Sequence, residues 1–203
     1  MANVGAEDHY FTNAPGSAAR NHHVELETER GRVRLRSSDG TFSPRRIDPG
    51  TAVLLASLPD PGGWPDGPVL DLGCGYGPIA AAVSIRSPGR SVWGVEVNER
   101  AADDCRHNAA ALSLDIRVAA PGEVPEDQRF AAIVSNPPVR IGKAALRALL
   151  SGWLPRLVDD GEAWLVVQRH LGADSLAAWL DDTGWRTERI RSRRGYRVLR
   201  VRR

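Results

Sequence analysis

A chain of 203 residues with 42% hydrophobic residues, 26% charged residues and a net charge of +2 has the composition of a folded globular protein, which excludes disorder throughout. Its longest uncharged apolar run, 72–85, is too short and too rich in glycine to span a bilayer, and no secretion signal precedes it, so we expect a cytoplasmic protein without membrane contact. The two cysteines provide neither a disulfide framework nor a metal-ligand spacing, and no metal is expected.

The first part of the chain, 1–58, predicts an extension ahead of the main domain. Residues 1–23 are polar and mostly without period, which indicates a flexible lead-in. Alternating apolar and charged residues over 24–36 predict a small β-hairpin. A helix is expected over 50–58, with Asp48 near its N-cap.

The stretch 59–68 is rich in proline and glycine and predicts a surface linker into a single domain over 68–203. In this domain short apolar runs alternate with helical patterns, which is typical of a parallel sheet covered by helices on both faces. The last two strands are expected to form an antiparallel hairpin. The sequence therefore predicts an α/β, Rossmann-like fold with a mostly parallel seven-stranded sheet. The predicted strands are 68–72, 91–95, 116–119, 131–135, 162–168, 185–191 and 196–201, and the helices are 79–87, 99–112, 142–157 and 175–183.

A glycine-rich turn joins the first strand of the domain to its first helix. Three glycines alternate with other residues in the segment 71–78, DLGCGYGP, which brings bare backbone against a ligand. A nicotinamide enzyme normally uses the spacing G-x-G-x-x-G around a pyrophosphate. The carboxylate of Asp71 would repel a pyrophosphate but attract the ammonium group of S-adenosylmethionine. This favours the methyl donor over a dinucleotide and over a purely structural turn. The predicted cofactor contacts here are Asp71, Gly73, Cys74, Gly75 and Pro78.

Glu96 ends the second strand of the domain, about 25 residues after Asp71. A carboxylate at this place can accept hydrogen bonds from both hydroxyls of a ribose. The alternative is that Glu96 is only a solvated acid at the end of a strand. This alternative is less favoured because Glu96 follows a glycine loop in the chain. Glu96 is therefore predicted to bind the cofactor.

The fourth strand of the domain ends in the turn Asn136-Pro137-Pro138. The two prolines stiffen this turn and leave its carbonyls without competing local donors. The Asn136 side-chain oxygen and the Pro137 carbonyl could accept hydrogen bonds from one amino group and so aim its nitrogen lone pair at the donor methyl. Asn-Pro-Pro alone is more often a plain turn, but here it follows a cofactor loop. We predict that Asn136, Pro137 and Pro138 are catalytic and that Asn136 also binds the cofactor.

With these motifs the chain resembles the small-domain branch of class I S-adenosylmethionine-dependent methyltransferases, which includes the bacterial ribosomal small-subunit guanine-N2 enzymes. The resemblance implies that Asp48 and Thr51 close over the cofactor and that 136–138 hold the target amine. It is carried by the segments 8–11 (DHYF), 42–43 (FS), 47–51 (IDPGT), 71–78, 136–138, 141–143 (IGK) and 195–198 (GYRV).

Two departures from the family pattern narrow the chemistry. Val139 stands where enzymes acting on adenine N6 or on protein glutamine usually have an aromatic residue. Adenine N6 and protein glutamine are therefore less favoured as acceptors. The segment 119–122, AAPG, lacks the aspartate that often binds the adenine amino group of the cofactor. Adenine recognition is then expected to rest on backbone, on apolar packing or on Glu123.

The net charge hides a basic C-terminal end. Residues 183–203 contain nine arginines and one acid, a net charge of +8, which leaves −6 for the rest of the chain. This distribution favours a polyanionic partner such as RNA, although exposed arginines on a terminal hairpin can also serve solubility alone. The predicted contacts with substrate or RNA are Val139, Arg140, Lys143, Arg193, Arg194 and Arg197.

The sequence therefore predicts an S-adenosylmethionine-dependent N-methyltransferase that acts on an exocyclic amine, foremost guanine N2 of ribosomal RNA, with RNA or the small ribosomal subunit as partner. The alternatives are a methyltransferase for a small-molecule or protein amine, a non-catalytic RNA-binding module, and a nicotinamide oxidoreductase, which the glycine spacing and Asp71 disfavour. The target nucleotide, the choice between free RNA and an assembled subunit, and the oligomeric state are left open.

Overall fold

The computed structural model describes residues 20–138 and 141–203. Its strands are β1 (Asn21–Thr28), β2 (Gly31–Ser38), β3 (Val69–Leu72), β4 (Val92–Val95), β5 (Ile116–Ala119), β6 (Phe130–Ser135), β7 (Leu157–Gln168), β8 (Arg186–Arg193) and β9 (Tyr196–Arg202). Its α-helices are α1 (Pro49–Leu55), α2 (Pro78–Arg86), α3 (Glu99–Ala111), α4 (Lys143–Trp153) and α5 (Ala173–Asp182). Short 3-10 turns lie at Pro61–Gly63, Pro121–Glu123, Leu154–Arg156 and Arg169–Leu171.

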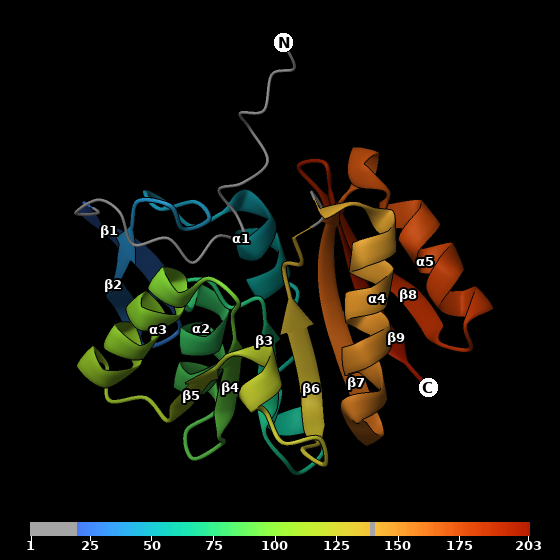
Figure 1. The fold of residues 1–203 in the computed structure, drawn as a ribbon, viewed down its shortest axis with the longest axis horizontal. Coiled ribbons are helices and arrows are strands. Elements are labelled where there is room, and N and C mark those ends of the chain that lie inside the picture. The colour runs from blue at the N-terminus through green and yellow to red at the C-terminus, as the bar shows by residue number, and fades with distance from the viewer. Residues whose placement is uncertain (1–19, 139–140) are drawn as a thin grey trace.

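The main sheet has the strand order β5-β4-β3-β6-β7-β9-β8, and a separate two-stranded sheet is formed by β1 and β2 (Figure 1). The five strands β5, β4, β3, β6 and β7 run parallel to one another, whereas β9 is antiparallel to both β7 and β8. The predicted α/β, Rossmann-like class is confirmed, with its C-terminal antiparallel hairpin and its N-terminal hairpin.

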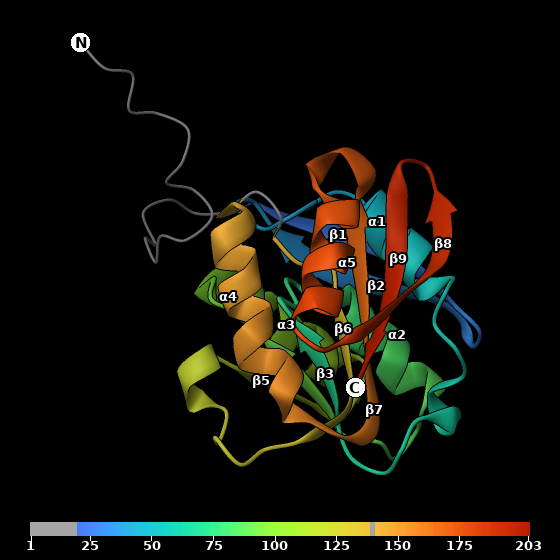
Figure 2. The same cartoon turned by 90° about the vertical axis from the view of Figure 1, so that its right-hand side faces the viewer.

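Helices cover both faces of the sheet, which explains why the central strands β3, β4 and β6 are buried along their whole length. All six residues of β6 are buried. Ile133 packs with Leu150 of α4, whereas its neighbour Val134 packs with Leu54 of α1 and Ile79 of α2. Alternate residues of one strand therefore face opposite layers, with α1 and α2 on one side and α4 and α5 on the other (Figure 2).

The N-terminal hairpin packs on the main domain rather than standing apart from it. Val24 and Leu35 are buried in one cluster with Tyr76 of the glycine loop. Asn108 of α3 connects the two parts, because its Nδ2 donates to the carbonyls of both Arg36 and Tyr76, at 2.8 and 2.9 Å. The hairpin thus packs against the glycine loop and supports it. The division of the chain into an extension, 1–58, and a domain, 68–203, stays a prediction.

The predicted lead-in is corrected at its end. Strand β1 begins at Asn21, and His22 hydrogen-bonds Asp39 through its Nε2 at 2.7 Å, so these residues are part of the hairpin. The rest of the lead-in, residues 1–19 with the segment 8–11, lies outside the described residues.

The predicted surface linker is also wrong at two residues, because Pro61 and Trp64 are buried. Trp64 is 5% exposed, and its Nε1 donates to Glu162 at 2.7 Å, so the linker is anchored to β7. Helix α4 ends at Trp153 instead of continuing to 157, because Pro155 has no N–H and its ring clashes with a preceding helical turn. Strand β7 then begins at Leu157, five residues earlier than expected.

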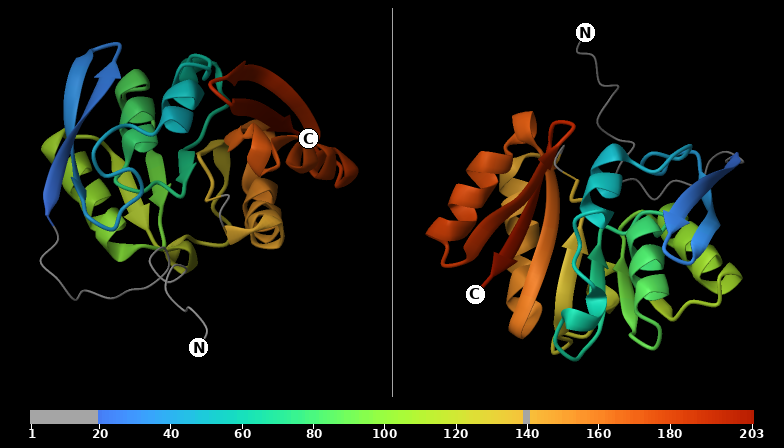
Figure 3. Two further views of the ribbon diagram at one scale, coloured as in Figure 1. Left: turned by 90° about the horizontal axis from the view of Figure 1, so that it is seen from above. Right: turned by 180° about the vertical axis from the view of Figure 1, so that it is seen from behind.

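Strands β8 and β9 are joined by the two-residue turn Arg194-Gly195, with φ angles of 52° and 80°. Two successive positive φ angles match the twist of an antiparallel hairpin and favour glycine at the second position. This hairpin and the β1–β2 hairpin lie at opposite ends of the molecule (Figure 3). No helix within 20–138 and 141–203 is long and apolar enough to cross a membrane.

Candidate active site

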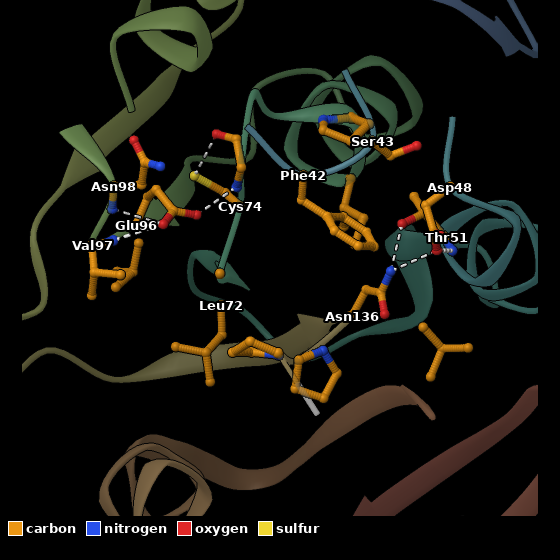
Figure 4. Close-up of a pocket in the computed structure, with 18 of the residues that line it drawn as sticks. Phe42, Ser43, Asp48, Thr51, Leu72, Cys74, Glu96, Val97, Asn98 and Asn136 are labelled. Atoms are coloured by element: carbon orange, nitrogen blue, oxygen red, sulfur yellow. Dashed lines mark hydrogen bonds between the residues drawn. The ribbon is translucent and has the colours of Figure 1, made fainter. Parts of the chain in front are cut away.

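A cavity of about 810 Å³ opens at the carboxyl ends of β3, β4, β6 and β7, the usual ligand position in an open α/β sheet. Figure 4 shows Glu96 and Asn136 on opposite sides of this cavity, with Phe42 between them. Predicted site residues in its wall are Asp48, Thr51, Gly73, Cys74, Gly75, Pro78, Glu96, Asn136, Pro137 and Pro138.

The glycine loop forms one wall of the cavity. Gly73, Gly75 and Gly77 have φ angles of 76°, 56° and 90°, values that residues with a Cβ rarely adopt. A Cβ on Gly77 would also lie 2.6 Å from the sulfur of Cys105 in α3. The bare backbone therefore brings α2, α3 and the cavity close together, as the alternating glycines predict. Pro78 begins α2 immediately after the loop.

Cys74 lies in this wall but carries no reactive thiolate. A hydrogen bond with Cys105 and burial both raise the pKa of its thiol well above the ordinary value. Both cysteines are free and buried, so a structural role fits them. Within the part of the chain that the structure describes, no group of three His, Cys, Asp or Glu side chains could hold a metal ion.

Glu96 is held rigidly at the mouth of the glycine loop. Its Oε2 accepts from the backbone N–H of Gly75 at 2.8 Å, and its Oε1 accepts from Val97 and Asn98, both at 2.9 Å (Figure 4). A carboxylate has about four lone-pair sites, so Oε2 retains capacity for a hydroxyl donor from the cavity. The position fits the predicted contact with a ribose.

Asp71 lies at the junction of loop and helix rather than in the cavity wall. It is 1% exposed, and its Oδ2 accepts from the N–H of Ala80 in the first turn of α2 at 2.9 Å. Its Oδ1 is buried without a hydrogen-bond partner among the described residues. Asp71 does not line the cavity, and its predicted direct contact with the ligand ammonium stays a prediction. A cation bound in the cavity would favour the ionised form of this carboxyl.

The pKa of Asp71 is raised to about 8. Burial is the main cause and the charge of Glu96 adds to it, whereas the hydrogen bond from Ala80 acts in the opposite direction. In the folded protein the group therefore keeps a proton that the unfolded chain, with the ordinary value of 3.8, has already released. Its contribution to the free energy of unfolding is fully present below the ordinary pKa and is lost as the pH rises through about 8.

We therefore expect an Asp71→Asn variant to lose this pH dependence, because asparagine can still accept from Ala80 but never ionises. Urea unfolding of wild type and variant between about pH 5 and about pH 8 measures it, because the other carboxyl groups cancel in the difference. The wild-type free energy of unfolding should fall relative to that of Asp71→Asn as the pH rises. A difference that stays constant across this range would show that the buried carboxyl is already ionised.

Asn136 is oriented by the start of α1. Its Nδ2 donates to Asp48 Oδ1 at 2.9 Å and to Thr51 Oγ1 at 3.0 Å (Figure 4). Asp48 is also the N-cap of α1 and accepts from the N–H groups of Gly50 and Thr51. Because an ionised carboxylate only accepts, the amide nitrogen must face Asp48, and Asn136 Oδ1 is left to accept from another group. Asp48 and Thr51, predicted to cover the cofactor, therefore also fix the Asn136 amide that the sequence predicts to be catalytic.

The residues predicted to contact substrate or RNA differ in where the structure places them. Val139 and Arg140 lie outside the described residues. Lys143 is exposed at the start of α4, where its Cε lies 3.5 Å from the Cβ position of Gly172, and it does not line the cavity. Arg193 and Arg194 are exposed at the β8–β9 turn.

Arg197 lies in different surroundings from Arg193 and Arg194. It is ion-paired with Asp174 of α5, and its side chain is only 13% exposed. This pairing and the low exposure make Arg197 less accessible to a phosphate than Arg193 and Arg194, and its RNA contact stays a prediction.

Glu123 was one of the predicted contacts with the cofactor adenine, and it lies away from the cavity. Glu123 does not line it, because its carboxylate accepts from the N–H of Ala120 at 2.7 Å and closes a turn of backbone. The wall here is formed instead by Val97, which is 52% exposed, and by Pro121. Of the three predicted routes to adenine recognition, Glu123 therefore loses support, while backbone contacts and apolar packing stay predictions.

Sequence reasoning missed several residues of the cavity wall. Val97 and Asn98 follow Glu96 directly, so their position after a strand was an available signal. Phe42 lies in a segment that the resemblance included without a role. Tyr196 likewise lies in the segment 195–198 that the resemblance included without a role. Gln168 is brought to the cavity by strand pairing, for which the sequence carries no local signal. The missed residues are Phe42, Ser43, Val97, Asn98, Pro121, Gln168 and Tyr196.

The donor set suits S-adenosylmethionine in three respects. The volume lies within the usual range for small-molecule sites, a fixed carboxylate faces the cavity, and a buried unsatisfied carboxylate oxygen lies behind the loop. Fold and cavity together define a Rossmann-like methyltransferase. The model of the "Methyltransferase small domain" family matches residues 32–200, and the chain belongs to this family.

Among curated proteins, the chain is 27% identical over 198 residues to the uncharacterized protein YbxB of Bacillus subtilis, covering 96% of this chain and 98% of that protein. It is 33% identical over 152 residues to the ribosomal RNA small subunit methyltransferase C of Shewanella pealeana, covering 72% of this chain and 43% of that enzyme. The chain therefore spans less than half the length of this ribosomal RNA enzyme.

Among solved structures, the T. thermophilus 16S rRNA N2 G1207 methyltransferase RsmC, in complex with AdoMet and guanosine, superposes with a TM-score of 0.76 at 23% identity. The match covers 95% of this chain and 53% of that one. The ribosomal protein L11 methylase of Lactobacillus delbrueckii gives a TM-score of 0.61 at 20% identity. These structures share the fold. With the family, they confirm the class of S-adenosylmethionine-dependent methyltransferase that the sequence resembled.

Proposed function

We propose that this protein transfers a methyl group from S-adenosylmethionine to an exocyclic amine of RNA, with guanine N2 of ribosomal RNA as the acceptor. The observation that carries the proposal is the orientation of Asn136, whose amide nitrogen is bound to Asp48 and Thr51 while its oxygen is left as an acceptor. The similarity to ribosomal RNA small subunit methyltransferase C and to RsmC supports the choice of acceptor. The cytoplasmic location predicted from the sequence belongs to this proposal.

The residues around Asn136 supply positioning and charge compensation. An exocyclic amine is a weak nucleophile because its lone pair is delocalised into the ring. Two acceptors, Asn136 Oδ1 and the Pro137 carbonyl, can hold its two N–H groups and thereby fix the direction of the nitrogen lone pair. The Asp48 carboxylate, 2.9 Å behind the amide, strengthens this dipole toward the positive charge that develops on nitrogen.

The cofactor end is separate from the acceptor end. S-adenosylmethionine, when bound, supplies an electrophilic methyl group on a sulfonium. Glu96 would hold its ribose, and the apolar side chains of Val97 and Pro121 would enclose its adenine. Figure 4 shows Glu96 and Asn136 on opposite sides of the cavity, so the methyl group of a bound cofactor would have to reach from one side toward the other.

The β8–β9 turn supports RNA as the carrier of the amine. Strand β9 begins at Tyr196 in the cavity wall, so the exposed side chains of Arg193 and Arg194 flank the cavity by chain connectivity. A target amine must be unpaired or flipped out of its helix, which costs a few kcal/mol. Phosphate contacts beside the cavity are a direct way to offset that cost.

RNA binding should therefore depend steeply on salt, with a slope of about −0.7 per neutralised phosphate for single strands. An Arg193→Ala, Arg194→Ala double variant should flatten this slope by about 1.4, as measured by filter binding of ribosomal RNA fragments across a salt series. The matched control is Arg30→Ala with Arg34→Ala, an equal loss of charge from exposed residues of the opposite hairpin. Equal slopes in wild type and both double variants would favour a small-molecule or protein amine as the acceptor.

A further inference from the structure

Gln168 lies at the acceptor end of the cavity, beside the catalytic turn. Strands β6 and β7 are parallel, with Ser135 paired to Leu165 at the end of β6. Strand β7 continues for three residues past that point, alongside the 136–138 turn, and Val166 and Gln168 both line the cavity. Because side chains alternate along a strand, Gln168 shares the face of Val166, which packs with α1 and α2.

The amide of Gln168 is held by Tyr196. These two residues are opposite each other in the β7–β9 ladder, and Gln168 Nε2 donates to the Tyr196 hydroxyl at 2.8 Å. The Tyr196 ring in turn packs on the start of α1, where a Cβ on Gly50 would lie 2.6 Å from the ring. Asp48 and Thr51 of the same helix start hold Asn136. One helix end therefore supports both side-chain amides, each with its nitrogen bound inside the protein and its oxygen left to accept.

Two acceptors on one site match only one common nucleobase edge. Guanine presents its exocyclic N2 amine next to the N1–H, so two neighbouring groups donate. Adenine and cytosine instead present their amines next to a ring nitrogen that accepts. An acceptor at Gln168 Oε1 therefore complements guanine and opposes the other two.

We propose that Gln168, positioned by Tyr196, selects guanine by accepting a hydrogen bond from its N1–H while Asn136 holds the N2 amine. This rests on the proposed function, since it assigns the specificity of the same site. It predicts that the preference depends on the Gln168 oxygen and on the tyrosine hydroxyl that orients it.

The test is binding of guanosine, 1-methylguanosine and adenosine to the full chain saturated with S-adenosylhomocysteine, measured by calorimetry. Gln168→Leu should weaken guanosine binding about tenfold and leave 1-methylguanosine, which has no N1–H, unchanged. Gln168→Glu, which keeps an acceptor, should retain guanosine binding. Tyr196→Phe frees the amide to turn its nitrogen outward and should lower the preference for guanosine over adenosine several-fold. Unchanged affinity for S-adenosylhomocysteine in each variant verifies that the site is folded.

The outcomes separate this inference from the proposed function. In the first case, wild type prefers guanosine to adenosine, but Gln168→Leu weakens binding of guanosine and 1-methylguanosine equally or weakens binding of neither. Gln168 then does not recognise the N1–H, and this inference fails while the proposed function stands. If wild type binds adenosine at least as well as guanosine, guanine is not the acceptor and the proposed function fails, whatever Gln168 does.

Discussion

An Asn136→Ala variant is expected to lose about 10²–10³-fold in turnover and to retain nearly all of its affinity for S-adenosylmethionine. The reason is that Asn136 Oδ1 is the acceptor positioned for the target amine, whereas the cofactor's ribose is assigned to Glu96 on the other side of the cavity. Single-turnover methyl transfer to ribosomal RNA, together with calorimetry of the cofactor, separates the two effects.

Thr51→Val gives a matched comparison for this prediction. It removes one of the two acceptors that hold the Asn136 amide and leaves Asp48 in place. A smaller loss of turnover than in Asn136→Ala is expected, because the amide keeps its orientation through the carboxylate. Full methyl transfer by Asn136→Ala would show that this turn does not hold the acceptor, and catalysis would have to be sought around Asp48 and Gln168.

Glu96→Ala should weaken binding of S-adenosylmethionine about tenfold to a hundredfold, since a hydrogen bond to a charged acceptor contributes roughly 1.5–3 kcal/mol. The structure adds a reason for the upper part of this range, because Glu96 also accepts from Gly75 and so orders the loop itself. Calorimetry measures the change. Glu99→Ala is the control, as it removes the same charge from an exposed position three residues further on. Equal affinities for wild type and Glu96→Ala would remove Glu96 from the site.

Local sequence signals were sufficient for much of this site. The alternating glycines of 71–78 predicted a bare loop between strand and helix, and their positive φ angles match that interpretation. The Asn-Pro-Pro motif predicted the turn after β6 because its position relative to the strands was readable from hydrophobic runs. These features depend on neighbouring residues only.

Features set by tertiary contacts were not predictable in the same way. The strand-end position of Asp71 suggested a side chain facing the ligand, but its burial and its hydrogen bond to Ala80 depend on how α2 packs. Arg197 looked like its arginine neighbours, yet alternation along β9 turns it toward Asp174 of α5. Gln168 and Tyr196 are 28 residues apart in the chain and meet only through the register of β7 and β9.

The most direct test of the central claim is mass spectrometry of nucleosides from the ribosomal RNA of cells that lack this protein, before and after complementation. The proposal predicts that N2-methylguanosine decreases in the deficient cells, returns with the wild-type gene and does not return with Asn136→Ala. An unchanged set of methylated nucleosides in ribosomal RNA, with the purified protein transferring the methyl group to a small molecule or a protein, would contradict it.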